Sequence, residues 1–468
     1  MSKTATTATA TTTITKATVH LEAKPERRLI RPGGSKRHVD FVLRADALSA
    51  GHPVRPPLTL ALVLDRSGSM QGEKLVTAKR AVLSVLDQLQ EQDRAALVVF
   101  DNVIDVIHEA LPVTSALKRR TRASLGELEA RGATALHEGW LTGCRAIAPG
   151  TPNSPGTPAM ANAGGRSGIT RCFLLTDGQA NEGVVDPEQI AKEAGDIRAH
   201  AGIGTSTFGI GTDYDEGLLG PLAIAGGGQF HHLRTPEEIA RTFVGELGGL
   251  LSVVASSVTL ELETGQAVQA EVVSAYGISR PSGTSESAGN AVAVSGTVSI
   301  PVGELMGGEE KHIVVRLSFP KGTVGTGAAT RARAVWSATQ TDSLTGMAVR
   351  HATEWHELRF TRASNAACDA ELKDADVMHW VGLHHADKAR REAAERSKRG
   401  DLAGAKRTLQ RVSQHIQTYA SDDEELAAAL DELREVEEVV AAAPASAMVA
   451  KELVAESYRR SRGQRDHR

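Results

Sequence analysis

The amino-acid sequence predicts a doubly wound, Rossmann-like α/β domain that is inserted in an all-β sandwich and followed by an α-helical region. Residues 56–251 alternate apolar runs of strand length with helical patterns, as in a parallel sheet covered by helices. Residues 252–361 change to a period of two, which is typical of strands with one buried face. Residues 366–442 return to helical spacing.

The first 50 residues divide into a low-complexity lead and a pair of strands. Residues 1–14 are rich in Thr and Ala, and we expect them to be disordered. Residues 15–50 contain strand-like runs at 18–21 and 38–43. A ribbon of two strands is marginally stable in water, so we expect these strands to pair with strands of residues 252–361. The α/β domain is then an insertion whose two ends lie close together.

The most informative stretch of the α/β domain is 58–70, LTLALVLDRSGSM. Its first half is apolar at every position, which indicates a strand buried on both faces. Asp65, Ser67 and Ser69 follow in the loop after that strand, where open α/β sheets bind their ligands. A carboxylate and two hydroxyls offer only oxygen, which suits a hard cation such as Mg²⁺.

This D-x-S-x-S pattern resembles the metal-ion-dependent adhesion site of von Willebrand factor type A (VWA) domains. The segment RGATAL at 131–136 resembles the second loop of that family, and CFLLTDG at 172–178 resembles the third. The three segments occur in the family's order and at similar separations. The resemblance implies a metal site formed by Asp65, Ser67, Ser69, Thr134 and Asp177.

The resemblance also implies a function. A Mg²⁺ ion, with Ca²⁺ or Mn²⁺ as substitutes, would keep an open coordination position for an Asp or Glu of another protein. The chain would then be a metal-dependent protein–protein interaction module or adaptor, with no catalytic residues.

Two other classes of function stay open at this point. The chain could be a client-delivery or regulatory subunit of a chaperone or chelatase-like ATPase complex. The ATPase would be another chain, because no GxxxxGK[ST] motif occurs. A metal-dependent hydrolase needs a base near the metal, and His137 is the candidate within the matched loops. A lone histidine there is better explained by packing or capping within a helix.

The order of a VWA domain, a β segment and helices resembles bacterial cytosolic VWA proteins and eukaryotic ubiquitin ligases with a VWA-integrated region. Those ligases carry a zinc-bound RING with paired cysteines and histidines. This chain has three widely separated cysteines and no such spacing, so we do not expect ligase activity.

Several other segments carry expectations. The Pro- and Gly-rich stretch 149–168 is expected to be a mobile insertion at the amino end of its strand. Asp213 and Asp215 are either further carboxylates near the metal or parts of a solvated turn. Residues 386–419 predict a helical hairpin with a Gly-Asp break, and 443–468 predict a last helix and a basic tail.

Composition limits the partners. The 53 Lys and Arg against 57 Asp and Glu give a formal net charge of −4, which gives no reason to expect nucleic acid. No segment approaches the ~18 consecutive apolar residues of a membrane span, and we expect no signal peptide. We therefore expect a cytoplasmic protein.

Overall fold

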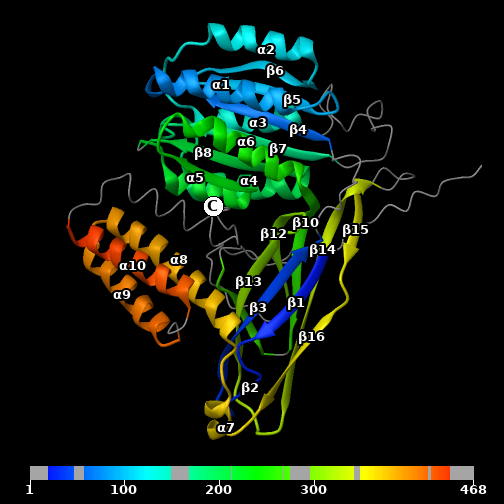
Figure 1. Cartoon of the computed structure of the whole chain (residues 1–468), viewed down its shortest axis with the longest axis vertical. Coiled ribbons are helices and arrows are strands. Elements are labelled where there is room, and N and C mark those ends of the chain that lie inside the picture. The colour runs from blue at the N-terminus through cyan, green and yellow to red at the C-terminus, as the bar shows by residue number, and fades with distance from the viewer. Residues whose placement is uncertain are drawn as a thin grey trace, which may run out of the picture.

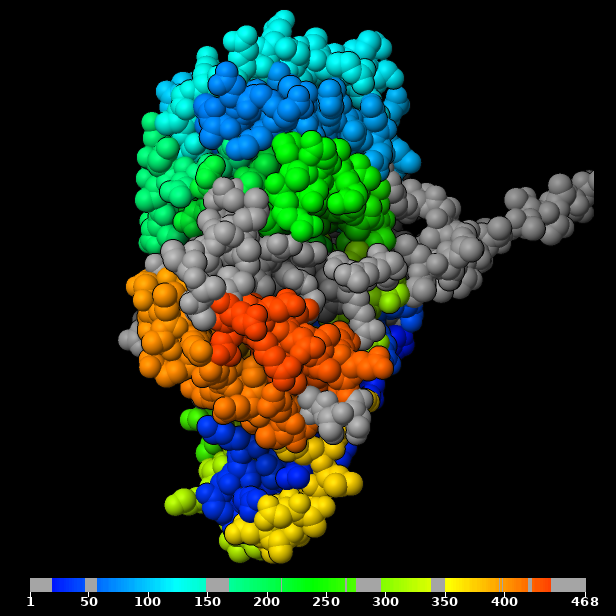
Figure 2. Space-filling model, turned by 60° about the vertical axis from the view of Figure 1, so that its left-hand side comes forward, coloured from blue at the N-terminus to red at the C-terminus, as the bar shows by residue number. Residues whose placement is uncertain are grey.

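The computed structural model contains an α/β domain, a β-sandwich beneath it and a group of helices beside the sandwich (Figure 1). Figure 2 shows the helices of this group, in orange and red, in front of the sandwich and below the α/β domain. The structure describes residues 19–46, 57–148, 168–211, 213–265, 267–274, 296–341, 348–419 and 423–442. The predicted lead, most of the 149–168 stretch and the predicted helix and tail at 443–468 lie outside these residues.

A six-stranded sheet forms the centre of the α/β domain. Its strand order is β6-β5-β4-β7-β8-β9, in which β6 is antiparallel to β5 and the other neighbours are parallel. Every residue of β4 and of β5 is buried, as expected for strands covered on both faces. The strands are β4 (Leu58–Asp65), β5 (Arg94–Phe100), β6 (Ile104–Pro112), β7 (Ile169–Thr176), β8 (Ile203–Ile210) and β9 (Gly227–Leu233).

Helices cover both faces of this sheet and bury two separate apolar clusters against it. The helices on one face are α1 (Glu73–Gln88), α2 (Ser115–Glu127) and α6 (Glu238–Leu251). Those on the other face are α3 (Leu136–Ile147), α4 (Pro187–Ala201) and α5 (Glu216–Ala225). Asp186 caps α4, because its side chain accepts a hydrogen bond from the backbone N–H of Glu188.

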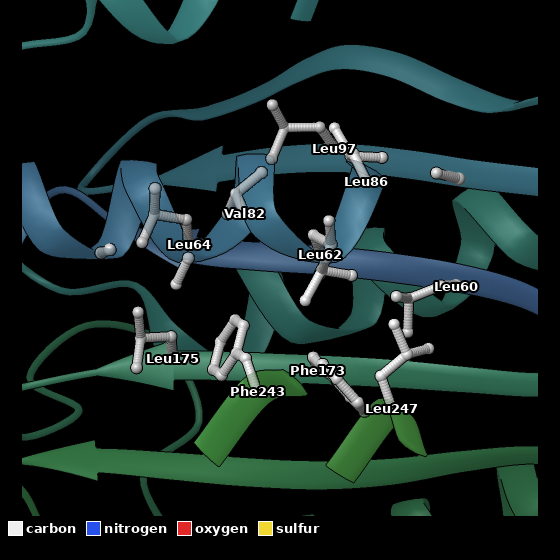
Figure 3. Close-up of a cluster of buried hydrophobic side chains, with 14 of the residues drawn as sticks. Leu60, Leu62, Leu64, Val82, Leu86, Leu97, Phe173, Leu175, Phe243 and Leu247 are labelled. Atoms are coloured by element: carbon white, nitrogen blue, oxygen red, sulfur yellow. The ribbon is translucent and has the colours of Figure 1, made fainter. Parts of the chain in front are cut away.

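The core between the sheet, α1 and α6 is closely packed (Figure 3). Leu62 and Leu64 of β4 point toward α1 and α6, together with Phe173 of the neighbouring strand. Phe208 lies between two other rings, with centroid distances of 5.1 Å to Phe173 and 4.2 Å to Phe243. This rigid core fixes the strand ends that carry the predicted metal ligands.

Two sheets form the sandwich, and the N-terminal strands take part in both. Neighbouring strands are antiparallel, except that β2 is parallel to β16. The first has the order β1-β3-β13-β11, and the second has the order β12-β10-β14-β16-β2, with β15 paired to β14. The first contains β1 (Val19–Pro25), β3 (Ser35–Ala45), β13 (Glu310–Phe319) and β11 (Gln269–Val272). The second contains β12 (Thr297–Met306), β10 (Val253–Thr264), β14 (Gly327–Thr341), β15 (Ala348–Ala352), β16 (His356–Arg362) and β2 (Leu29–Ile30).

The pairing of β3 with β13 shows that the α/β domain is inserted in the sandwich. Phe41 of β3 lies opposite Ile313 of β13, and both side chains are buried in the sandwich core. The chain leaves the sandwich after Ala45, and it returns through α6, which is separated from β10 by Ser252 alone. The strands before and after the α/β domain therefore share one core, as the marginal stability of the N-terminal ribbon predicts.

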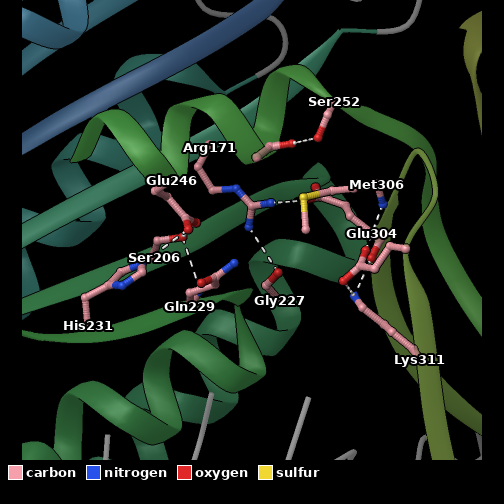
Figure 4. A network of polar contacts seen from close by, with 12 residues as sticks. Arg171, Ser206, Gly227, Gln229, His231, Glu246, Ser252, Glu304, Met306 and Lys311 are labelled. Carbon is pink, nitrogen blue, oxygen red and sulfur yellow. Dashed lines mark hydrogen bonds and ion pairs between the residues drawn. The ribbon is translucent and has the colours of Figure 1, made fainter. Parts of the chain in front are cut away.

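A polar network joins the α/β domain to the sandwich (Figure 4). The buried guanidinium of Arg171, on β7, forms an ion pair with Glu304 of β12. Glu246 of α6 accepts a hydrogen bond from the hydroxyl of Ser206 at 2.6 Å, and it lies 3.2 Å from Nε2 of His231. Burial alone would raise the pKa of Glu246, but His231 and Arg171 outweigh it and lower this pKa. The ion pair of Arg171 with Glu304 thus holds the inserted domain to the sandwich besides its two chain connections.

The C-terminal region is a group of helices that packs on the first sheet of the sandwich. It contains α7 (Asn365–Ala370), α8 (Ala375–Lys398), α9 (Leu402–Gln417) and α10 (Glu424–Ala442). Asp401 caps α9 after Gly400, which has a φ of 80°, so the predicted Gly-Asp break is confirmed. Among the described helices, none combines the length and the hydropathy that crossing a bilayer requires.

The prediction that the helical hairpin begins at 386 was wrong. Helix α8 begins at Ala375, because its first turns bury Val377, Met378 and Val381 against the outer face of the sheet, near Val314. The core that α8 shares with α9 and α10 has Ala386 as its first buried α8 residue, so the pattern of the hairpin alone starts at that position.

Candidate metal centre

The predicted metal ligands lie at one edge of the α/β sheet. Asp65 is the last residue of β4, and Asp177 follows the last residue of β7. These two strands are parallel neighbours, so their carboxyl ends lie side by side. Thr134 precedes α3 in the loop that approaches the same edge. The position agrees with the general location of ligand sites in open α/β sheets.

Asp65 is fully buried at the base of the site. Its Oδ1 accepts a hydrogen bond from the backbone N–H of Ser67 at 2.7 Å, and its Oδ2 accepts one from the hydroxyl of Thr176. Burial raises the pKa of Asp65 to about 6, and the nearby charge of Asp177 acts in the same direction. The hydrogen bonds from Thr176 and Ser67 lower this pKa but do not outweigh the effect of burial. These hydrogen bonds orient the carboxylate, and a bound cation would oppose the effect of burial and favour its charged form.

Hydroxyl groups connect the first loop to the third. The Oγ atoms of Ser67 and Ser69 lie 3.1 Å apart, and Ser69 donates a hydrogen bond to Oδ1 of Asp177 at 2.7 Å. A Cβ atom placed on Gly178 would lie 3.1 Å from Oγ1 of Thr134 and 3.6 Å from Oγ of Ser69. The structure therefore brings the predicted oxygen donors of all three loops together, with Gly178 leaving room between them.

Lys74 is a neighbour of the site that sequence reasoning missed. It lies in the first turn of α1, and its ammonium group forms an ion pair with the buried Oδ2 of Asp177. Nζ also lies 3.4 Å from the carbonyl oxygen of Ser69. The position of Lys74, at a helix start just past the loop with the predicted metal ligands, was the signal that could have revealed it. The ammonium group of Lys74 therefore already offsets the negative charge of Asp177.

An ion-pair cluster that the sequence did not reveal links the loop after β4 to the loop before α3. The carboxylate of Asp101 is buried, and its Oδ2 lies 2.9 Å from Nε of Arg66 and 2.8 Å from Nε of Arg131. Burial alone would raise the pKa of Asp101, but Arg131, the backbone N–H of Val103 and Arg66 outweigh it and lower this pKa. The backbone N–H of Gly68 also donates to the second loop, so these contacts fix the relative position of the two loops.

The second and third loops are joined through Asn181. Its side-chain oxygen accepts a hydrogen bond from the backbone N–H of Thr134 at 2.9 Å. Its own backbone N–H donates to the carbonyl oxygen of Thr134 at 3.3 Å. The hydroxyl of Thr134 is thus held in place by its backbone.

Several other titratable residues of the α/β domain make contacts that stabilise the fold. His137 lies in α3, where its Nε2 is 2.7 Å from Oε2 of Glu193 on α4. Asp215 caps α5, because its Oδ1 accepts a hydrogen bond from the backbone N–H of Gly217 at 2.8 Å. His232 lies on the face of β9 opposite that of His231. Its Nδ1 is 2.6 Å from the hydroxyl of Tyr214.

The donor set fits a hard, strongly hydrated divalent ion. Hydroxyl and carboxylate oxygens are the ligands that Mg²⁺ takes, and this ion usually keeps several waters. Among the described residues, no group of three or more His, Cys, Asp or Glu side chains is arranged to hold a metal. Two carboxylates are therefore the charged ligands that this edge can offer, and further coordination must come from hydroxyls, water or another molecule.

Comparison with known proteins identifies the α/β domain. The sequence model of the von Willebrand factor type A domain matches residues 59–243. Together with the strand order and the helices on both faces, this match shows that the chain contains a VWA domain. VWA domains form a family of protein-interaction modules that commonly bind a divalent metal.

Relatives match parts of the chain. The uncharacterized protein sll0103 of Synechocystis sp. is 30% identical over 209 residues, which are 45% of this chain and 45% of that protein. The E3 ubiquitin-protein ligase WAV3 of Arabidopsis thaliana is 29% identical over 269 residues, which are 57% of this chain and 31% of that protein. The chain thus spans less than half the length of these curated relatives.

One solved structure shares the whole architecture. The von Willebrand factor type A protein from Catenulispora acidiphila superimposes with a TM-score of 0.70 over 95% of this chain and 97% of that chain. The two sequences are 18% identical, so this likeness establishes the fold alone.

Proposed function

We propose that the chain is a non-catalytic binding module that captures a carboxylate of another protein at a Mg²⁺ site formed by Asp65, Ser67, Ser69, Thr134 and Asp177. The observation that carries the proposal is the convergence of these oxygen donors around a site that has one open side. Asp65, Thr134 and Asp177 are buried, whereas Ser69 is exposed. A bound ion would supply a Lewis-acidic centre at this open side.

The chain's own residues would orient such an ion and leave room for an external ligand. Asp65 and Asp177 carry two negative charges, Lys74 already offsets that of Asp177, and the hydroxyls are neutral donors, so a divalent ion here would keep a net positive charge. The coordination needs of Mg²⁺ exceed this set, so water or an external carboxylate completes it. A carboxylate is the favoured partner group because it carries charge and its oxygens are hard ligands.

The surroundings of the site support binding over catalysis. A hydrolase would need a base aimed at the metal-bound substrate. His137 is 8% exposed and its Nε2 contacts Glu193, so this imidazole is engaged with α4.

The three free, buried thiols Cys144, Cys172 and Cys368 suit the reducing cytoplasm that we propose as the compartment.

Affinity capture with the full-length chain tests the proposal. The immobilised chain is incubated with an extract of its native host in Mg²⁺ or in EDTA. We expect one or more proteins to be retained in Mg²⁺, lost in EDTA and lost in Asp65→Ala. Asp87→Ala, which removes an exposed carboxylate at the far end of α1, is the matched control and should retain them.

The captured proteins, together with a hydrolysis assay of the same chain and its variants, separate the alternatives. A metal-dependent partner that is itself an ATPase would make the chain a subunit of an ATPase complex. A partner retained equally in EDTA would place the binding surface on the sandwich or the helices. Metal-dependent hydrolysis that is lost in both Asp65→Ala and His137→Ala would make the chain an enzyme and refute the proposal.

A further inference from the structure

A second candidate site lies far from the metal centre, between the sandwich and the C-terminal helices. A cavity of about 760 Å³ separates the outer face of the sheet that contains β3 and β13 from helices α8 and α10. This volume is within the usual range of small-molecule pockets. We propose that this cavity binds a small organic cation, an amine or guanidinium compound.

The charge of the lining favours a cation. Two cationic residues, Lys24 and Arg44, line the cavity, and both are already engaged by carboxylates. Arg44 forms an ion pair with Glu310, and Nζ of Lys24 lies 3.5 Å from Glu22 and 3.8 Å from Asp376. The carboxylates of the lining outnumber these cations by six to two; they are Asp40, Glu310, Asp376, Asp423, Glu424 and Glu425.

Asp40 supplies an independent indication of a ligand. Its side chain projects from β3 on the face opposite the sandwich core, and it is 2% exposed. Oδ2 lies 2.6 Å from Nδ1 of His312, but Oδ1 has no hydrogen-bond partner among the described residues. The hydroxyl of Tyr419, which also lines the cavity, likewise has no partner among those residues. A buried carboxylate oxygen without a donor is costly, and the N–H groups of an amine or guanidinium would satisfy it.

Aromatic rings provide a second element of recognition. Trp380 of α8 lines the cavity and stacks on His312, with ring centroids 3.7 Å apart and an interplanar angle of 15°. Tyr419 also lines the cavity. Aromatic faces attract organic cations, and the side chains of Val42 and Leu426 add apolar contact for an alkyl chain.

A metal ion fits this cavity less well. The described residues contain no group of three or more His, Cys, Asp or Glu side chains arranged to hold one. His312 and His379 are each engaged by carboxylates, through Asp40 and Asp423 at 2.6 Å in both cases. An organic cation can donate N–H hydrogen bonds to the carboxylates of the lining and can contact its apolar side chains, whereas a bare metal ion can do neither.

Calorimetric titration of the full-length chain with 1,4-diaminobutane, spermidine and agmatine tests the proposal. We expect at least one of these probes to bind saturably with one site per chain and to change the fluorescence of Trp380. Asp40→Asn should weaken this binding about tenfold or more, because it removes the charge that faces the ligand. Asp87→Asn is the matched control and should bind as the wild type does.

Two further variants keep the test decisive if Asp40→Asn does not fold. Glu425→Gln changes a carboxylate that is 53% exposed at the rim, and it should weaken binding several-fold. Trp380→Leu should weaken binding and abolish the fluorescence change. Asp65→Ala should bind the probe normally, because the metal centre lies in another domain. Absence of saturable binding by all three probes, or binding that is unchanged in both Glu425→Gln and Trp380→Leu, would overturn the proposal.

Discussion

Acidification should destabilise the protein through a buried histidine, His384. This residue lies on α8, where its side chain is 2% exposed. Burial lowers its pKa to about 3, and the charges of Arg391, His312 and His385 act in the same direction. In the unfolded chain the pKa of a histidine is about 6.5. The unfolded state therefore binds a proton first as the pH falls, and the stability that depends on neutral His384 is lost from about pH 6.5 down to about pH 3.

The size of the effect follows from the two pKa values. At pH 5.0 the unfolded imidazole is mostly protonated and the folded one is not, so this residue alone lowers the free energy of unfolding by about 2 kcal/mol relative to pH 7.5. His384→Leu removes the titrating group and fills the site with an apolar side chain. We expect the variant to lose about 2 kcal/mol less than the wild type between these pH values.

Urea denaturation at pH 7.5 and pH 5.0, followed by tryptophan fluorescence and circular dichroism, measures this difference. His200→Leu replaces an exposed histidine on α4, and it should keep the pH dependence of the wild type. If His384→Leu loses as much stability at pH 5.0 as the wild type does, the imidazole is not held neutral in the folded state and the reasoning fails.

Three further predictions concern packing and charge. Gly178→Ala places a Cβ 3.1 Å from Oγ1 of Thr134, so Mg²⁺ affinity measured by calorimetry should fall while the melting temperature changes little. Gly143→Ala places a Cβ 2.2 Å from Cγ2 of Val63, and it should lower the free energy of unfolding by about 1–3 kcal/mol in urea denaturation. Arg171→Met leaves Glu304 without its partner at the domain interface, and it should cost about 2–3 kcal/mol; a stability equal to the wild type would contradict the role of this pair.

The sequence predicted those parts of the fold that depend on local pattern. The buried strands appear as continuous apolar runs, and β4 is buried at all of its positions. The insertion in the sandwich was also predictable, because strands that precede the α/β domain need partners. The pairing of Phe41 with Ile313 supplies them. The loops with the predicted metal ligands follow the strand ends, so their convergence follows from the parallel sheet.

The rest depends on contacts between residues that are far apart in the sequence. The early start of α8 at Ala375 comes from packing on a sheet of another domain. The contact of Lys74 with Asp177 and the two arginines around Asp101 are electrostatic pairs that no local pattern reveals. The cavity beside Asp40 exists only because the last domain folds back on the first sheet.

The most direct test of the central claim is a calorimetric titration of the metal-free, full-length chain with Mg²⁺ and with Mn²⁺. The proposed centre predicts one ion per chain, and it predicts that Asp65→Ala abolishes this binding while circular dichroism shows a folded protein. Absence of binding in the wild type, or equal binding in Asp65→Ala, would contradict the claim that these loops hold a metal.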